Sequence, residues 1–369
     1  MQPLILLILV GALFVGFSNG ANDNFKGFAT VWGSQTLSYR RALALATIAT
    51  IAGGIASVIL AHGLVQQFSG KGLVPDGIVA SHAFVAAVAI GAAITVIAAT
   101  RIGMPVSTTH ALLGSLIGAG VALGATSINW RALGDSFILP LAASPVMAAL
   151  LGFSVYSVVS RSRSDTDCAC IVQNDPRLAD VAAMAAVAGP GLPSIVCSST
   201  EECDRMPGVA ARVEIPAVLD HVHFLSAAAI CFARAVNDTP KLAALLIAAS
   251  AVGAQYSAAL VAVAMGLGGV LLARRVAETM SLKINRLDHA QGISANLITA
   301  VLVIFASRWG LPVSTTHVSV GSISGVGARA RTLDWTALRA VLLSWIATLP
   351  FAAAAAWSAA TLLNVAGMS

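Results

Sequence analysis

Charged residues are scarce in this chain. Of its 369 residues only 10% are Asp, Glu, Lys or Arg, against roughly 25% in soluble domains. Aromatic residues make up 6%, while 57% of the chain is hydrophobic and the mean hydropathy is +0.86. This composition excludes a soluble globular protein and predicts an all-α, polytopic helical membrane protein. The formal net charge of +5 does not indicate nucleic acid as a partner, because the basic residues stand in short loops between apolar segments, where they report on topology.

The features of a cleavable signal peptide are also missing from the N-terminal region. The apolar run 4–17 has no basic segment before it and no A-x-A-like cleavage site after it. We therefore interpret this run as the first transmembrane helix.

Apolar segments recur along the chain at lengths that can cross roughly 30 Å of hydrocarbon. The first half contains five of them, at 3–18, 42–62, 79–99, 105–125 and 136–160, and the second half contains five more, at 217–234, 254–273, 289–308, 312–330 and 336–364. Each half also has a shorter apolar segment directly after an Asn-Asp pair, at 23–37 and 238–252. We expect about five crossings per half plus one re-entrant or broken helix.

The chain is internally duplicated. The hexapeptide Pro-Val-Ser-Thr-Thr-His occurs at 105–110 and again at 312–317, and other matches keep nearly the same spacing. The further matches are Asn22, Asp23 and Lys26 with Asn237, Asp238 and Lys241, Trp130 with Trp335, and Pro145 with Pro350. The sequence thus predicts a first transmembrane repeat at 1–160, a polar extramembrane linker at 161–215 and a second repeat at 216–369.

Loop charge predicts that the two repeats have inverted topology. The loop 63–78 has a single basic residue, Lys71, whereas its counterpart 274–288 contains Arg274, Arg275, Lys283 and Arg286. The positive-inside rule places these loops on opposite sides of the membrane, as five crossings per repeat would. Arg40, Arg41 and the linker are then cytoplasmic and both termini lie outside, although Arg131 and Arg308 would also fall outside.

Both hexapeptides have the composition of an anion site. Hydroxyl groups donate hydrogen bonds without charge, and proline suits the first turn of a helix, where free N–H groups favour an oxyanion. The candidate hydroxyls are Ser107, Thr108 and Thr109 with their copies Ser314, Thr315 and Thr316. The alternative is that these side chains only bond back to the preceding helical turn. Exact duplication favours binding.

Asp23 and Asp238 are the second pair of candidates, because an intramembrane carboxylate is costly to bury. With Asn22 and Asn237 they could bind Na⁺, or they could accept the proton of a protonated phosphate. Sulfate has no such proton at neutral pH, so these acceptors favour phosphate. The alternative is that each carboxylate only caps the helix that follows it.

These residues together resemble the signatures of the inorganic phosphate transporter (PiT) family of cation-coupled phosphate permeases. The resemblance rests on Gly20-Ala21-Asn22-Asp23, the second Asn237-Asp238 pair and both hexapeptides, and it covers the chain except the linker. It implies an inverted-repeat helical fold, a substrate site near the midplane and a homodimer. It also implies that the Asn-Asp pairs bind cation and substrate, and that the hexapeptide hydroxyls bind phosphate.

Two lysines depart from the family pattern. Lys26 and Lys241 stand three residues after their aspartates, where small residues are usual, and Ala235-Val236 replaces the usual Gly-Ala. One helical turn lets each lysine reach its own aspartate. We hypothesise that the ammonium groups replace a bound Na⁺ or join the anion site, which would leave proton coupling or a weaker dependence on Na⁺. The alternative is that the lysines snorkel to the membrane interface.

His110, His317 and the cysteines give weaker signals. The two histidines could respond to pH, or could serve only in capping and interhelical bonds. Cys168, Cys170, Cys197 and Cys203 cluster in the linker, with Cys231 in an expected helix. A C-x-C pair with two further cysteines could bind Zn²⁺, but their spacing fits no standard zinc template. A cytoplasmic location disfavours disulfides, so we expect free thiols.

The sequence therefore predicts a secondary active importer of inorganic phosphate across a bacterial cytoplasmic membrane, coupled to Na⁺ or H⁺ and without a bound cofactor. A sulfate permease is the alternative substrate assignment. Ser107 with His110, or Ser314 with His317, superficially resembles a nucleophile and its base, but duplication suits symmetric binding better than one catalytic centre. A channel would lack saturable, ion-driven accumulation.

Overall fold

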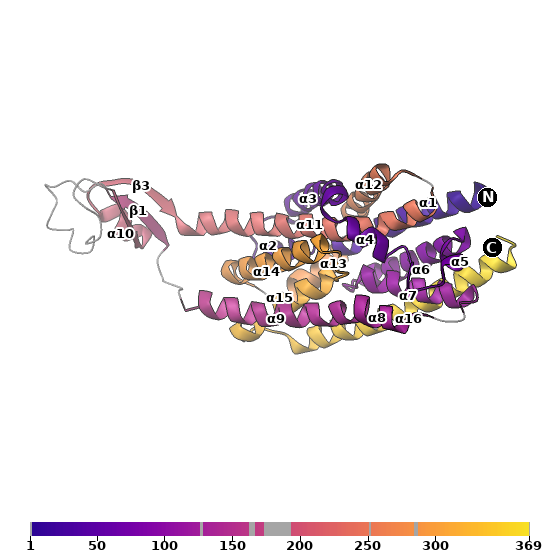
Figure 1. Cartoon of the computed structure of the whole chain (residues 1–369). Helices are drawn as coiled ribbons and strands as arrows, with labels where there is room; N and C mark the ends of the chain where they lie inside the picture. Colours follow the sequence, from indigo (N-terminus) through magenta and orange to yellow (C-terminus); the bar gives the residue numbers. More distant parts are fainter. Residues whose placement is uncertain are drawn as a thin grey trace.

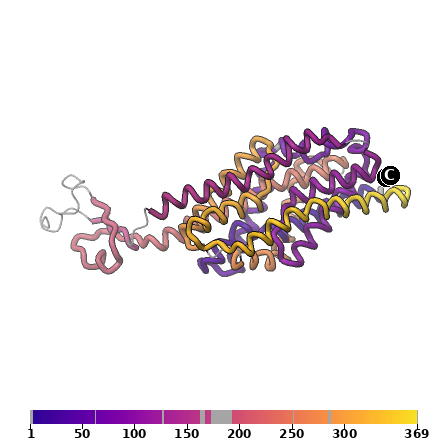
Figure 2. Tube along the Cα trace, turned by 90° about the horizontal axis from the view of Figure 1, so that it is seen from below, coloured from indigo at the N-terminus to yellow at the C-terminus, as the bar shows by residue number. Residues whose placement is uncertain are grey.

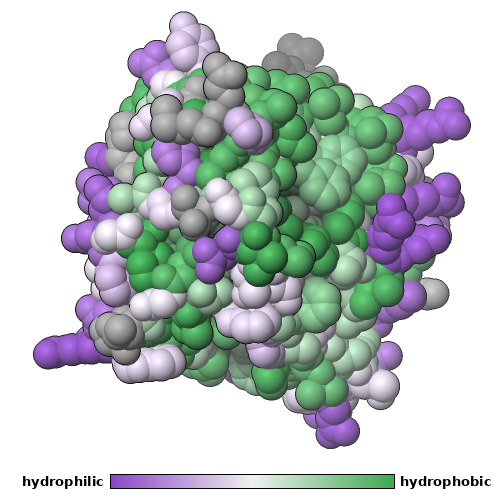
Figure 3. Space-filling model, turned by 90° about the vertical axis from the view of Figure 1, so that its right-hand side faces the viewer, coloured by the Kyte–Doolittle hydropathy of each residue, from purple (hydrophilic) through white to green (hydrophobic). Residues whose placement is uncertain are grey.

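The computed structural model describes residues 2–125, 128–161, 167–172, 193–250, 252–283 and 287–368. Long helices lie along one axis of an elongated bundle, a small β-containing module projects from one end, and both termini lie at the opposite end (Figures 1 and 2). The view onto the terminus end shows hydrophobic side chains over much of that face, with most hydrophilic ones toward its edges (Figure 3). The all-α prediction is confirmed for the membrane part.

Eight helices are long and apolar enough to cross a membrane among the residues that the structure describes. In the first half they are α1 (Gln2–Asp23), α3 (Tyr39–Leu60), α6 (His82–Arg101) and a continuous run of α8 (Trp130–Leu133), the π-helical η1 (Gly134–Ile138) and α9 (Leu139–Val159). In the second half they are α11 (Ile215–Ala248), α12 (Ala254–Leu272), α14 (His289–Arg308) and α16 (Trp335–Val365).

The segments expected to cross at 105–125 and 312–330 contain helices that are shorter than the eight long ones. They form α7 (Thr108–Ala122) and α15 (Thr315–Ala330), of 15 and 16 residues. At a rise of 1.5 Å per residue, such helices cover roughly 22–24 Å, less than the roughly 30 Å of hydrocarbon. The reason is local: Ser107 and Ser314 have extended backbones and serve as N-caps, so the preceding Pro-Val residues stay outside the helix.

The expectation of a broken helix after each Asn-Asp pair holds only in the first half. There α1 ends at Asp23, a turn follows, and the short α2 (Ala29–Gly33) comes next. Gly27 in this turn is pressed against α11, where an added Cβ would lie 2.5 Å from the Ala227 carbonyl oxygen. In the second half α11 runs unbroken for 34 residues despite Pro240, because Leu242 at the equivalent position and its Leu and Ala neighbours favour helix.

Helices of the two halves pack against each other in matching pairs. The first-half helix α7 packs on α16 and its counterpart α15 packs on α9, while α1 packs on α12 and its counterpart α11 packs on α3. The equivalent helices α1 and α11 run in opposite directions, since α1 starts at the terminus end and α11 starts at the linker (Figure 1). Buried residues of α1, α6, α7, α11 and α16 form the largest apolar core.

Shorter elements complete the fold. They are α4 (His62–Gln67), α5 (Asp76–Val79), α13 (Arg274–Glu278) and the π-helical η4 (Thr279–Lys283). The linker contains β1 (Cys168–Val172), β2 (Ser194–Ser198), α10 (Thr200–Arg205) and β3 (Val209–Glu214). Its strands form an antiparallel sheet in the order β2-β1-β3. The sequence analysis did not predict these strands.

Candidate substrate-binding site

The Asn-Asp pairs and the hexapeptides meet in the interior of the bundle. Asp23 is the last residue of α1, and Asp238 lies about two thirds of the way along α11. The hexapeptides lead into α7 and α15. All ten residues predicted to contact substrate are buried: Asp23, Lys26, Ser107, Thr108, Thr109, Asp238, Lys241, Ser314, Thr315 and Thr316.

Lys26 connects its own repeat to the opposite hexapeptide. Its ammonium group forms an ion pair with Asp23 and donates to the carbonyl oxygen of Val106 at 3.2 Å. It also donates to the hydroxyl of Thr316, which belongs to the second repeat. One buried cation therefore bridges a carboxylate and both hexapeptides.

Lys241 makes the same set of contacts with the repeats exchanged. Its Nζ lies 3.4 Å from Oδ1 of Asp238 and donates to the carbonyl oxygen of Val313 at 2.8 Å. It also donates to the hydroxyl of Thr109 in the first repeat at 2.9 Å. The exposed fractions of Lys26 and Lys241 are 3% and 1%, so snorkelling to the interface was the wrong alternative.

Two residues that sequence analysis missed join the halves of this network. Asn19 donates to Thr108 at 2.9 Å and to one oxygen each of Asp23 and Asp238 at 3.3 Å. Arg234 donates to the side-chain oxygen of Asn19 at 3.0 Å and lies 3.9 Å from Asp238. Both stand four residues before an aspartate, on the same helical face, and this spacing could have identified them.

Arg234 also connects the site to α3 and to the turn after α1. It donates to the hydroxyl of Thr50 at 2.7 Å, and Thr50 in turn donates to the side-chain oxygen of Asn24 at 2.6 Å. These contacts hold the guanidinium group next to Asn19. Burial of so large a charged side chain requires such partners.

Asn22 and Asn237 hold the segments around the hexapeptides in place. Asn22 donates to Thr100 at 3.0 Å and to the Met104 carbonyl oxygen at 3.0 Å, and it accepts from the backbone N–H of Val106 at 3.1 Å. Asn237 accepts from Ser307 at 3.1 Å and donates to the Val313 carbonyl oxygen at 3.2 Å. These contacts give both amides a structural role, and a role in binding Na⁺ stays a prediction.

The serine and histidine of each hexapeptide do not form a catalytic pair. The Ser107 hydroxyl accepts from the backbone N–H of His110 at 3.2 Å, and Ser314 accepts in the same way from His317 at 3.3 Å. These are N-cap bonds of α7 and α15. The imidazole rings lie against each other instead, with centroids 4.6 Å apart, and His317 also stacks on Trp345.

The charges of the site give it a positive excess. In the described part of the chain, the buried Asp, Glu, Lys and Arg side chains are Asp23, Lys26, Arg234, Asp238 and Lys241. Three formal positive charges face two negative ones, which leaves one positive charge. A polar, buried and positively charged interior lined by hydroxyl groups can hold an anion.

Comparison with known proteins agrees with this chemistry. The model of the phosphate transporter family matches residues 19–356. The chain belongs to the phosphate transporter family. The transporter is 28% identical over 366 residues to a probable low-affinity inorganic phosphate transporter of Bacillus subtilis, covering 98% of each chain. It is also 26% identical to a candidate phosphate permease of Pyrococcus abyssi, covering 95% of this chain and 96% of the relative.

A solved structure supports the fold. The structure described as the sodium-dependent phosphate transporter superposes with a TM-score of 0.78 at 22% identity, covering 99% of this chain and 100% of the other. The family confirms that the chain is a multi-pass membrane transporter of phosphate rather than an enzyme. The comparisons give no support to the sulfate alternative.

Proposed function

We propose that the chain is a secondary active transporter that imports inorganic phosphate by alternating access of two inverted repeats, 1–160 and 216–369. The observation that carries the proposal is the exchange of contacts between Lys26 and Lys241. Each ammonium group binds its own aspartate and the threonine of the opposite hexapeptide, Thr316 or Thr109. A site made of parts of both repeats opens to one side when the repeats rock against each other.

Phosphate fits the charge and donors of this site. Dihydrogen phosphate carries one negative charge, which balances the single excess positive charge of the five buried ionic side chains. Its hydroxyl groups can donate to Asp23 and Asp238 while its oxygens accept from the lysines and the threonine hydroxyls. With sulfate bound, the site would carry a net negative charge, and the carboxylates of Asp23 and Asp238 would have no proton to accept.

Radiolabelled phosphate uptake into proteoliposomes tests this assignment. We expect saturable accumulation that a tenfold excess of unlabelled sulfate leaves nearly unchanged. Equal competition by sulfate, together with uptake of labelled sulfate, would contradict the phosphate assignment. Uptake that never exceeds the outside concentration under any ion gradient would indicate a channel.

We further propose proton coupling. The ammonium groups of Lys26 and Lys241 occupy positions next to Asp23 and Asp238 that a Na⁺ ion would otherwise take. The solved structure with a similar fold is described as sodium-dependent. We propose that the two lysines make this chain independent of Na⁺. Transport would then leave Na⁺ gradients unused.

The linker end of the bundle is proposed to face the cytoplasm, with both termini outside. Because α11 leaves the linker and α12 runs back, Arg274 and Arg275 return to the linker side. The guanidinium of Arg274 lies 5.9 Å from the ring of Tyr39, so Arg40 and Arg41 share that side. Four arginines then satisfy the positive-inside rule. A homodimer in the cytoplasmic membrane remains part of this proposal.

A further inference from the structure

The linker module gathers three sulfur atoms at one point. Cys168 and Cys170 are two residues apart on β1, so their side chains lie on the same face of the sheet. Cys203 comes from α10, which packs on β1. All three are buried, and their sulfur atoms lie within 4.8 Å of one another. Transport as proposed above makes no use of this cluster.

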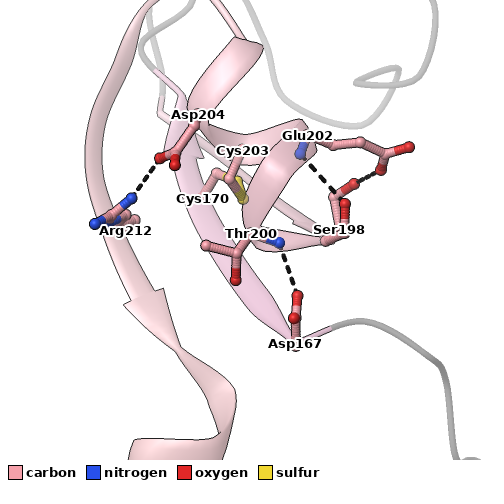
Figure 4. The surroundings of a disulfide bond; sticks show 9 residues. Asp167, Cys170, Ser198, Thr200, Glu202, Cys203, Asp204 and Arg212 are labelled. Atoms are coloured by element: carbon pink, nitrogen blue, oxygen red, sulfur yellow. Dashed lines mark hydrogen bonds and ion pairs between the residues drawn. A yellow bond between two sulfur atoms is a disulfide. The ribbon is translucent and has the colours of Figure 1, made fainter.

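Two of these cysteines form a disulfide, Cys170 with Cys203 (Figure 4). The expectation of free thiols is therefore wrong for this pair, because the fold of the module brings residues 33 positions apart into contact. Cys168 is a free thiol in the same cluster. The cluster thus holds one sulfur more than a disulfide needs.

The module holds the cluster by contacts other than the disulfide. The backbone N–H of Thr200 donates to Asp167 at 2.7 Å (Figure 4). Ser199 caps α10 by accepting from the N–H of Glu202 at 3.2 Å. Arg212 on β3 forms an ion pair with Asp204 on α10. These bonds keep α10 over the sheet, so Cys203 would stay beside the other two thiols after reduction.

We propose that the reduced linker module binds one soft, monovalent metal cation of the Cu⁺ class through Cys168, Cys170 and Cys203. Three sulfurs around one ion at about 2.3 Å are separated by roughly 4 Å. The three sulfur atoms already lie within 4.8 Å of one another, so opening the Cys170–Cys203 bond lets them reach this spacing with small movements. Soft thiolate and thioether ligands select Cu⁺, and the side chain of Met206 packs against the cluster.

The donor set favours Cu⁺ over Zn²⁺. Structural Zn²⁺ almost always takes four ligands, and the cluster found in the described residues consists of three cysteines, with no histidine or carboxylate among its members. The exposed fractions of Cys168, Cys170 and Cys203 are 0%, 0% and 2%, which restricts access of water as a fourth ligand.

The disulfide and the metal exclude each other, because Cys170 and Cys203 serve both. Two molecules of a low-molecular-weight thiol open the Cys170–Cys203 bond, are themselves oxidised to a disulfide and leave two protein S–H groups. Binding of Cu⁺ then displaces the thiol protons to water. The module would accordingly take up the metal only in a reducing environment.

Transfer of Cu⁺ from a coloured bicinchoninate complex to the full-length, detergent-purified protein tests the proposal. We expect the reduced wild type to take up one equivalent and the oxidised protein none. Cys168→Ser should weaken binding by more than about 100-fold, beyond the 10–100-fold loss typical of outer-shell partners. Cys197→Ser is the matched control, because Cys197 is exposed on β2 and pairs with Ala169, on the other face of β1; it should bind as the wild type does.

The fold of the Cys168→Ser protein is checked separately. Its oxidised form should keep the Cys170–Cys203 disulfide and show two free thiols after denaturation, from Cys197 and Cys231. No Cu⁺ uptake by the reduced wild type would overturn the proposal. Equally tight uptake by a correctly disulfide-bonded Cys168→Ser protein would also overturn it and would leave Cys168 as a small apolar core residue.

Discussion

At the scale of single residues, the ion pairs of Lys26 and Lys241 explain how five charged side chains are buried together. Each lysine forms an ion pair with its own aspartate. Arg234 lies 3.9 Å from Asp238 and donates a hydrogen bond to Asn19. Removing one partner of a buried ion pair typically costs about 3–5 kcal/mol, because the other charge is left uncompensated. Each member of the network is therefore sensitive to substitution.

Lys241→Gln and Lys26→Gln should each abolish most phosphate uptake. Either change removes an ammonium group that contacts the threonine of the opposite hexapeptide, and with it the positive excess that attracts the anion. The measurement is initial uptake rate in proteoliposomes at equal protein content. Lys283→Gln, an exposed lysine at the end of η4, is the control and should transport normally. Normal transport by both site variants would show that the lysines are not part of the anion site.

Arg234→Lys should lose activity although it keeps the charge. The guanidinium group of Arg234 donates to Asn19 and Thr50 through two different nitrogens. Lysine has a shorter side chain with a single nitrogen, so it cannot make both hydrogen bonds in the same geometry. Phosphate binding measured by radioligand in detergent should weaken about tenfold or more, the equivalent of one lost charged hydrogen bond of roughly 1.5–3 kcal/mol. Binding equal to the wild type would show that charge alone suffices at this position.

Sequence reasoning identified most residues of the buried polar cluster because duplication marked them twice. The aspartates, lysines and hexapeptide threonines are indeed brought together, since they stand at matching positions of both repeats. Asn19 and Arg234 were not predicted, because they occupy equivalent positions of the two repeats but are different residue types. The spacing of four residues before each aspartate would place both on the site face, but their contact with each other joins the two repeats and is not visible within either one.

At the scale of elements, the helices that follow the hexapeptides pack unusually close to their partners. An added Cβ at Gly118 of α7 would lie 2.0 Å from the carbonyl oxygen of Ala353 in α16. At the equivalent Gly325 of α15, it would lie 2.0 Å from the carbonyl oxygen of Ala149 in α9. Backbone approach of this kind is typical of small residues in membrane helix packing.

Gly118→Ala and Gly325→Ala should each destabilise the transporter by about 1–3 kcal/mol, the usual cost of overpacking. A backbone carbonyl cannot rotate away as a side chain can, so the helices themselves must separate. Thermal unfolding in detergent, followed by the ellipticity at 222 nm, should show a lower midpoint for both. Gly134→Ala is the control, because nothing lies within 4 Å of its added Cβ. An unchanged midpoint for both variants would contradict this account of the packing.

Element boundaries were less predictable than the existence of the spans. Hydropathy located the eight long helices, but it could not show that α7 starts only after the cap at Ser107, or that α11 continues through Pro240. The first outcome depends on the cap that the Ser107 side chain makes, and the second on the helix-favouring residues around Pro240. The break after α1 depends on a contact between helices, the approach of Gly27 to Ala227. The linker strands were missed because each is only five or six residues long.

At the scale of the whole molecule, both termini lie at one end and the linker at the other (Figure 1). The two ends of the bundle therefore face opposite sides of the membrane in the proposed orientation. The four arginines beside α3 and α13 predict that the linker end is cytoplasmic. The exposed Cys197 in the linker offers a direct probe.

A membrane-impermeant maleimide should label Cys197 only after the cells are permeabilised. Asn364→Cys in a Cys197→Ser background should instead react in intact cells, because Asn364 is exposed near the C-terminus. The readout is the gel shift of the purified protein. Labelling of Cys197 in intact cells, with protection of position 364, would show the opposite orientation.

The most direct test of the central claim is phosphate uptake by the wild-type protein in proteoliposomes with an inward proton gradient and no Na⁺. The account predicts accumulation above the outside concentration that collapses when a protonophore is added, and no added uptake when an inward Na⁺ gradient is supplied instead. Accumulation that requires the Na⁺ gradient and survives the protonophore would contradict the role assigned to Lys26 and Lys241.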